Sequence, residues 1–273
     1  MSRALQWRAL ALCVLIAGSG VAAACSDDDA DSTARLDVVT TLPLLADITS
    51  NVAGDRADVE ALLPAGTDPH TFEPSPGDVR AIAEADVVIG NGLNLEPSLL
   101  RVIGANISSD TVLIELAEAA ISAGVSVNPP RGQGGPDPHL WMDPEIGRQY
   151  AAIIRDTLSL VDPDGLETYS ANYEAYAATL DETQQYMRET TASVPADARL
   201  IITSHDAFGY LARAVDFEVV GFVAVGPGQE ASPDDISRLV TMIDALRIPA
   251  VFREPQTSVE TRTLQQIASD TGA

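Results

Sequence analysis

The sequence contains no lysine, and its 273 residues carry only 16 basic side chains, all of them arginine. Against these stand 40 aspartates and glutamates, which leave a formal net charge of −24 at pH 7. Proteins that bind nucleic acid or lie on anionic membranes depend on clustered basic side chains. We therefore expect no nucleic-acid partner and no membrane contact made by the protein surface.

Long hydrophobic runs are also lacking. The apolar stretch at residues 9–17 is shorter than the roughly 20 residues that a membrane-spanning helix needs. Arg3 and Arg8 precede this stretch, and small residues follow it. No acidic residue occurs in residues 1–24. This three-part layout is typical of a secretory signal peptide. We therefore predict a signal peptide over residues 1–24 and an exported protein.

Cysteine is scarce, with two in the chain. Cys13 lies inside the apolar stretch, so removal of the signal peptide leaves Cys25 as the first residue and the sole cysteine. A single cysteine in an exported protein needs an explanation. The sequence before it resembles a bacterial lipobox, which predicts a lipid on Cys25 and anchoring to the outer face of the cell membrane. Residues 22–24 also suit ordinary signal peptidase, which would leave a periplasmic protein. Residues 25–35 are mainly acidic and polar, and we expect a solvated tether there.

Beyond residue 35, short β-branched runs alternate with helical stretches. This alternation predicts an α/β fold with mainly parallel sheets. The expected strands are Leu36–Thr41, Val59–Leu63, Asp86–Gly90, Thr111–Glu115, Arg199–Ser204, Phe217–Val223 and Ala250–Glu254. The expected helices include Leu44–Ala53, Asp78–Ala85, Pro144–Leu160, Leu166–Ala192 and Asp234–Leu246.

The helical middle of the chain separates two groups of strands. We therefore expect an N-terminal α/β lobe over residues 36–160, a connecting helix over 161–195 and a C-terminal α/β lobe over 196–273. In the connecting helix, an apolar stripe falls on one face, which predicts core packing. Its members are Leu166, Tyr169, Tyr173, Tyr176 and Leu180. The sequence stops shortly after a helix, where another strand would normally follow, so we expect an incomplete second lobe.

Histidine is also scarce, and its count is the most informative one. The chain has three histidines: His70, His139 and His205. Each lies at an expected loop or strand end, where functional residues of α/β folds concentrate. The first two share the triplet Asp-Pro-His, and all three have a carboxylate within a few residues that could fix the imidazole tautomer. Their wide separation matches no local zinc-finger spacing. The joint pattern predicts one metal site that the fold must assemble.

At these residues the sequence resembles the metal-specific substrate-binding proteins of bacterial ABC transporters, the ZnuA/TroA-like group. The resemblance is carried by motifs spread over the chain: residues 38–44 (VVTTLPL), 68–76 (DPHTFEPSP), 86–96 (DVVIGNGLNLE), 137–144 (DPHLWMDP), 204–210 (SHDAFGY) and 251–256 (VFREPQ). It implies two α/β lobes joined by a long rigid helix, with a divalent metal in the cleft between them. It also implies an ABC permease as partner and delivery of the metal to that importer.

The resemblance implies that the metal ligands are His70 and His139 from the first lobe and His205 from the second. The family's fourth ligand is a carboxylate, at a position beyond residue 273. Three imidazoles favour Zn²⁺, whereas ligand sets richer in carboxylate favour Mn²⁺, so we expect zinc, with manganese or iron as the alternative. Four carboxylates could orient the ligands: Glu73, Asp143, Asp206 and Glu254.

Two other classes of function remain open from the residues. Three histidines and a water would also describe a zinc hydrolase, but the sequence has neither a His-Glu-x-x-His nor a Gly-x-Ser-x-Gly motif. A surface adhesin is an occasional label for relatives, and no motif here supports adhesion. We therefore expect a binding protein and not an enzyme.

Overall fold

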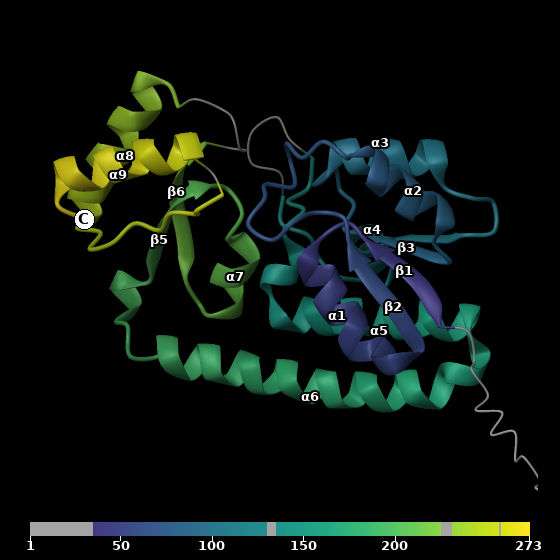
Figure 1. Cartoon of the computed structure of the whole chain (residues 1–273). Helices are drawn as coiled ribbons and strands as arrows, with labels where there is room; N and C mark the ends of the chain where they lie inside the picture. Colours follow the sequence, from purple (N-terminus) through teal and green to yellow (C-terminus); the bar gives the residue numbers. More distant parts are fainter. Residues whose placement is uncertain (1–34, 130–134, 225–230, 257) are drawn as a thin grey trace, which may run out of the picture. The chain divides into compact units, whose positions relative to one another are not determined.

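The structure is a computed structural model, and it describes residues 35–129, 135–224, 231–256 and 258–273. The expected signal peptide, the lipid attachment site Cys25 and the tether up to residue 34 lie outside the described residues, so the predictions for them stay predictions. The described chain forms two α/β regions with the long helix α6 (Leu166–Thr191) between them in sequence (Figure 1). We call the region from β1 to α5 the N-terminal lobe and the region from β5 to α9 the C-terminal lobe.

The N-terminal lobe is built on one parallel sheet with the strand order β2-β1-β3-β4. Parallel neighbours require crossover connections, which here are helical. Its elements are β1 (Leu36–Thr40), α1 (Pro43–Ala53), η1 (Gly54–Arg56), β2 (Ala57–Ala61), α2 (Pro76–Glu84), β3 (Val87–Gly90), α3 (Pro97–Asn106), β4 (Val112–Glu115), α4 (Leu116–Ser122), η2 (Leu140–Met142) and α5 (Pro144–Val161). The expected strands and helices of this half are confirmed, with ends shifted by a few residues.

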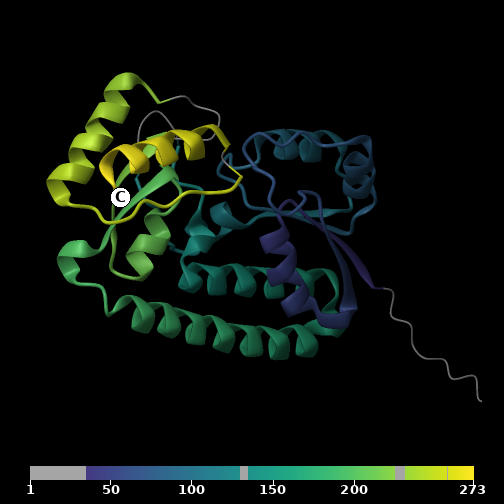
Figure 2. The ribbon, with the colours of Figure 1, turned by 60° about the vertical axis from the view of Figure 1, so that its left-hand side comes forward.

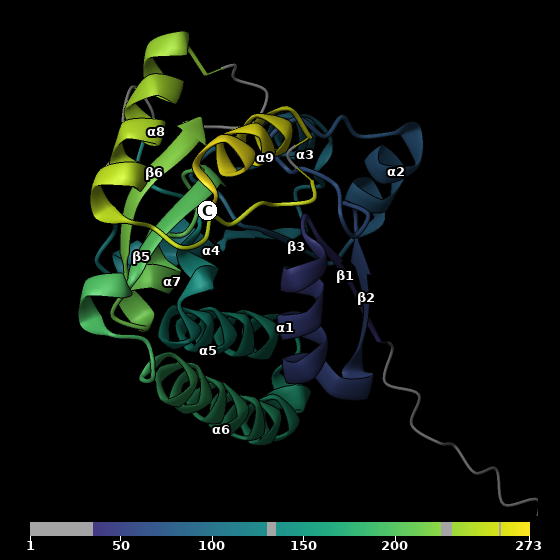
Figure 3. The same ribbon diagram turned by 90° about the vertical axis from the view of Figure 1, so that its left-hand side faces the viewer.

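Helices cover both faces of this sheet, so its central strand β3 is buried throughout, whereas the edge strand β2 alternates with Asp58 and Glu60. Val38 faces the layer of α1, α4 and α5, and its neighbour Val39 faces the layer of α2 and α3. Figure 3 shows these two layers on opposite sides of β1 and β3. The pleat therefore sends alternate residues of one strand into two separate cores.

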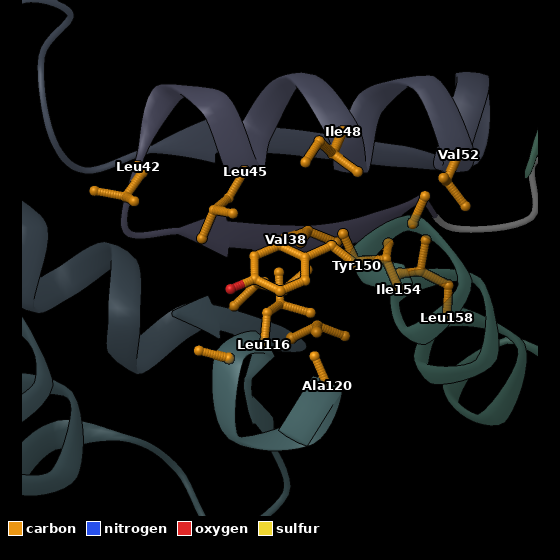
Figure 4. Close-up of a cluster of buried hydrophobic side chains, with 14 of the residues drawn as sticks. Val38, Leu42, Leu45, Ile48, Val52, Leu116, Ala120, Tyr150, Ile154 and Leu158 are labelled. Carbon is orange, nitrogen blue, oxygen red and sulfur yellow. The ribbon is translucent and has the colours of Figure 1, made fainter. Parts of the chain in front are cut away.

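The larger core lies between the sheet, α1, α4 and α5. Figure 4 shows side chains of α1 pointing toward Val38 of β1, Tyr150 of α5 and Leu116 of α4. The ring of Tyr150 is completely buried, and its hydroxyl donates to Oδ1 of Asn91 at 3.1 Å. Because that asparagine directly follows β3, this core reaches the carboxyl edge of the sheet, where functional loops of α/β folds lie.

Helix α6 follows α5 after the short turn η3 (Pro163–Gly165) and contacts both lobes (Figures 1 and 2). It packs on α1 and α5, and farther along Gln184 and Arg188 donate to the carbonyl of Ala214 in the C-terminal lobe. The expected apolar stripe is largely confirmed, with Tyr169 fully buried, but Leu166 at the first turn is 52% exposed. No helix in the described ranges is both long and apolar enough to span a membrane.

The C-terminal lobe contains η4 (Ala196–Ala198), β5 (Leu200–His205), α7 (Gly209–Ala214), β6 (Glu218–Ala224), α8 (Pro233–Leu246) and α9 (Ser258–Thr271). Strands β5 and β6 pair in parallel. The start of α8 is fixed by a capping box, in which Ser232 and Asp235 satisfy each other's backbone N–H groups. The core of this lobe gathers β5, β6, α8 and α9 around Ile202, and Figure 3 shows α8 and α9 beside these strands.

The prediction of a full strand over Ala250–Glu254 is wrong. The segment forms one parallel bridge, between Thr203 and Phe252, with the N–H of Phe252 donating to the carbonyl of Ile202. Pro249 and Pro255 stand at both ends, and proline has no N–H to donate to a ladder. The segment nevertheless lies beside β5, which brings Glu254 next to His205.

Candidate metal centre

The three histidines of the chain converge, although they are far apart in sequence. The ring centroids are 5.5 Å apart for His70 and His139, 5.9 Å for His70 and His205, and 5.3 Å for His139 and His205. One ring nitrogen from each lies within 4.8 Å of the other two. No other group of three or more metal-ligating side chains of this kind occurs in the parts of the chain that the structure describes.

His70 lies in the loop between β2 and α2. Asp68 shapes this loop, because its Oδ1 accepts from the backbone N–H of His70 at 3.0 Å and its Oδ2 accepts from the Thr71 hydroxyl at 3.0 Å. Pro69 stands between them and restricts the backbone before the imidazole. The loop ends where Ser75 caps α2, again with both halves of a capping box. Local hydrogen bonds therefore hold the His70 loop on both sides.

The His70 imidazole is neutral over the physiological range. Burial, together with the nearby imidazoles of His139 and His205, lowers its pKa to about 3. Its Nε2 is buried and has no hydrogen-bond partner among the residues that the structure describes. An unpaired buried polar atom is energetically costly, and a neutral imidazole nitrogen with a free lone pair is a metal ligand. His70 is thus ready to coordinate a cation without first losing a proton.

His139 directly precedes η2 and is 5% exposed. Oδ1 of Asp137 accepts from both Nδ1 and the backbone N–H of His139, at 2.8 and 3.1 Å. With the proton on Nδ1, the lone pair is on Nε2. Behind the ligand, Nδ2 of Asn91 donates to the carbonyl of Pro138 at 3.0 Å, which ties this segment to the end of β3. The ring of Trp141 packs edge-on against the imidazole, with centroids 5.5 Å apart.

His205 is the last residue of β5 and is 4% exposed. Oε2 of Glu254 accepts from Nδ1 of His205 at 2.6 Å and from the Ser204 hydroxyl at 2.7 Å. Within the described ranges, the Nε2 of His205 is buried without a hydrogen-bond partner, like that of His70. At both His139 and His205, therefore, a carboxylate oxygen accepts from Nδ1 and leaves Nε2 without that contact.

The four carboxylates proposed to orient the ligands lie in different places. Glu254 contacts His205, as described. Glu73 accepts from the Ser98 hydroxyl near the start of α3 and has a 76% exposed side chain. Asp143 caps α5 and pairs with Arg213 at 3.3 Å. Asp206 follows His205 in the chain and is half-buried. The orienting role thus stays a prediction for all four, and only Glu254 has a hydrogen bond to an imidazole among the contacts described.

Sequence reasoning missed two side chains around His139. Asp137 belongs to the Asp-Pro-His triplet, so its position two residues before the ligand was a local signal. Asn91 gave no such signal, because its contact with Pro138 joins segments that are 47 residues apart. Only the contact of Asn91 therefore depends on tertiary structure that the sequence spacing does not report.

The three imidazoles form a nitrogen-rich set of ligands in a mostly buried setting. Such a set suits zinc and other late divalent metals.

Comparison with known proteins agrees with this geometry. The sequence profile of the family described as "ZnuA: Zinc-uptake complex component A periplasmic" matches residues 38–273. The manganese-binding lipoprotein MntA of Halalkalibacterium halodurans is 34% identical over 263 residues, covering 96% of this chain and 84% of that protein. The manganese ABC transporter substrate-binding lipoprotein PsaA of Streptococcus pneumoniae is also 34% identical, covering 95% of this chain and 85% of that protein.

Solved structures show the same fold. The periplasmic zinc-binding protein TroA from Treponema pallidum matches with a TM-score of 0.77 and 30% identity, covering 87% of this chain and 84% of that chain. A crystal structure of ZnuA matches with a TM-score of 0.77 and 28% identity, covering 88% of this chain and 89% of that chain. The chain therefore belongs to the ZnuA family of metal-binding ABC-transporter components.

Proposed function

We propose that this protein captures a divalent metal ion outside the cytoplasmic membrane with His70, His139 and His205, and delivers it to an ABC importer. The observation that carries the proposal is the convergence of three imidazoles whose ligand nitrogens lie within 4.8 Å of one another. Two of these nitrogens, on His70 and His205, are buried and find no hydrogen-bond partner in the described part of the chain. A metal ion would satisfy them, and metal binding is the family's shared property.

The metal we favour is Zn²⁺, because three imidazoles match its preference for nitrogen ligands. The relatives named for manganese make Mn²⁺ the alternative. Metal uptake separates the two: cells that express the protein and cells that lack it are grown with Zn²⁺ and Mn²⁺ both present, and their content of each metal is compared. We expect the protein to raise the Zn²⁺ content. A rise in Mn²⁺ alone would assign the site to manganese.

The test of the site is zinc binding by the His139→Ala variant. Removal of one of three protein ligands should weaken zinc binding by at least about 100-fold, since each ligand supplies a large part of the affinity. X-ray absorption of the zinc-loaded protein adds a structural readout, because the chain has only three histidines and all imidazole scattering must come from this site. If His139→Ala bound zinc as tightly as the wild type, the site assignment would be wrong.

Anchoring is part of the proposal. Several relatives are named lipoproteins, and Cys25 stands at the expected lipid attachment position. A lipid there would keep the protein at the outer face of the membrane, near its permease. Mass spectrometry of the membrane-extracted protein should show a lipidated Cys25, and Cys25→Ala should release the protein. An unmodified mature chain that begins at Cys25 would instead support a periplasmic form.

A component of this kind binds and releases its cargo without changing it chemically. Membership of the ZnuA family supports a role as the substrate-binding component of a metal transporter rather than as an enzyme. The permease itself is a proposed partner, and in-membrane crosslinking to the importer encoded with this chain would test it.

A further inference from the structure

Tyr210 belongs to the C-terminal lobe in sequence but packs into the core of the N-terminal lobe. It lies in α7, five residues after His205, is completely buried, and clusters with Leu140 and Tyr150. Arg213 of the same helix covers the Tyr210 ring at 5.1 Å from its centroid. Helix α7 is therefore seated against the segment that carries His139.

The Tyr210 hydroxyl joins two stretches of that segment. It donates to the carbonyl of Asp137 at 3.0 Å and accepts from the backbone N–H of Asn128 at 3.0 Å. Burial raises the pKa of Tyr210 to about 12, so the hydroxyl keeps its proton and remains a donor at neutral pH. One oxygen atom thus fixes the backbone at residues 128 and 137 together.

Asp137 passes this constraint on to the imidazole. Its Oδ1 accepts from Nδ1 of His139 at 2.8 Å, and its Oδ2 accepts from Nδ2 of Asn128 at 3.2 Å. Gly209 permits the close approach of α7, because a Cβ at that position would lie 2.7 Å from Nδ2 of Asn128. The carbonyl and Oδ2 of Asp137 are therefore held by contacts near the start of α7, while its Oδ1 accepts from His139.

We propose that Tyr210 is a positioning residue of the metal centre, which fixes Asp137 and through it the direction in which His139 presents Nε2. The inference rests on the proposed metal-binding function and adds a residue that touches neither the metal nor a ligand. Residues 205–210 then act on two imidazoles. The segment contains His205 itself, and through Tyr210 it orients His139. This short segment therefore links metal affinity to the packing of the C-terminal lobe on the N-terminal lobe.

The test compares two tyrosine-to-phenylalanine variants of the full mature chain. Tyr210→Phe removes only the hydroxyl, and zinc affinity should fall about tenfold, within the range found for partners that orient metal ligands. The matched control is Tyr169→Phe, since Tyr169 is also completely buried and donates to Oδ2 of Asp162 at 2.6 Å, in the N-terminal lobe. Both variants should lower the Tm of the metal-free protein, whereas only Tyr210→Phe should lower zinc affinity.

A double-mutant cycle tests the route. If Tyr210 acts through Asp137, Tyr210→Phe should change zinc affinity little once Asp137→Ala is present, because the two residues are coupled. Nitrogen-15 NMR of the three imidazoles supplies a second readout. The wild type should hold the His139 proton on Nδ1, and Tyr210→Phe should reduce that tautomer's share.

The possible outcomes are distinct. Wild-type zinc affinity in Tyr210→Phe, with binding lost in His139→Ala, would overturn the positioning role and leave the proposed function intact. An equal loss with and without Asp137 would overturn the route through Asp137. A wild-type protein that binds neither Zn²⁺ nor Mn²⁺ would overturn the proposed function and this inference together.

Discussion

Nδ1 of His205 lies 2.6 Å from Oε2 of Glu254, and the two side chains are only 5% and 6% exposed. The carboxylate also accepts from the Ser204 hydroxyl and, at 3.3 Å, from the backbone N–H of His205. A carboxylate that accepts from Nδ1 fixes the tautomer of a metal-binding histidine and makes its Nε2 a better donor to the metal. The bridge between Thr203 and Phe252 brings this carboxylate to the end of β5.

Glu254→Gln should therefore weaken zinc binding by about 10-fold to 100-fold, because the amide keeps the shape but loses the negative charge. Zinc affinity is measured by competition with a chelator, and far-UV circular dichroism checks that the variant is folded. The affinity should fall without loss of the site's stoichiometry.

Glu189→Gln is the matched control for that change. Glu189 is exposed on α6 and accepts from Nε2 of Gln185 at 2.7 Å. Its zinc affinity should equal that of the wild type. An equal loss in both variants would mean that net charge, and not the contact with His205, controls affinity.

Stability of the N-terminal lobe should depend on the buried face of α5. Ile154 is completely buried in the larger core, whereas Leu160 on the same helix is 76% exposed. Ile154→Ala should lower the free energy of unfolding by about 2–5 kcal/mol, since it removes apolar contacts and leaves a cavity. Leu160→Ala should change it by less than about 0.5 kcal/mol. Urea unfolding of both variants, followed by circular dichroism, measures the difference.

Asp162, at the junction of α5 and α6, should make a pH-dependent contribution to the free energy of unfolding. Arg56 donates from Nε and Nη2 to its two carboxylate oxygens at 2.7 and 2.8 Å, and this hydrogen bonding lowers the pKa of Asp162 below its usual value of 3.8. A lowered pKa in the folded state stabilises the fold fully above pH 3.8, and the contribution is lost as the pH falls through the folded-state pKa. Asp162→Asn should therefore lower the urea midpoint near neutral pH, and the deficit should shrink below pH 3.8.

Asp156→Asn provides the comparison, because Asp156 on α5 is 70% exposed and pairs only with its neighbour Arg155 in the described contacts. Exposed ion pairs contribute little to stability, so this variant should unfold like the wild type at each pH. A deficit in Asp162→Asn that stays constant down to about pH 3 would contradict the proposed linkage.

Much of the fold followed from local pattern. Apolar, β-branched runs such as Val87–Gly90 predict buried parallel strands, and prolines at first helical turns, as in α5, mark helix starts. The segment around Phe252 shows the limit of this reasoning. Its composition is typical of a strand, yet flanking prolines reduce its pairing to one bridge.

The metal centre was predictable only in part, for a related reason. The Asp-Pro-His triplets and the scarcity of histidine can be seen in the sequence itself, and they pointed to the three histidines that the structure brings together. The partner of His205 was one candidate among four carboxylates, and only the placement of residue 254 beside β5 favours it. Tyr210 sits in the lobe opposite to His139, and no sequence spacing reports a contact across 73 residues.

Gly92 should be intolerant of a side chain, although it lies outside the ligand set. Its φ is +86°, a left-handed conformation, and a Cβ there would lie 1.9 Å from Oε2 of Glu118. That carboxylate is held in place, because its Oε1 accepts from the N–H of Leu93 at 2.7 Å. Gly92→Ala should therefore destabilise the protein by about 1–3 kcal/mol.

The same substitution should also weaken zinc binding, because Asn91 precedes Gly92 and donates from Nδ2 to the carbonyls of both Gly92 and Pro138. Gly104→Ala is the matched control: Gly104 lies in α3 with open space around its missing Cβ. There alanine should stabilise the protein by about 0.5–1 kcal/mol, since it favours helix and restricts the unfolded chain. Thermal unfolding and zinc competition on both variants separate the two effects. Unchanged zinc affinity in a destabilised Gly92→Ala variant would show that the tie between Asn91 and Pro138 does not orient His139.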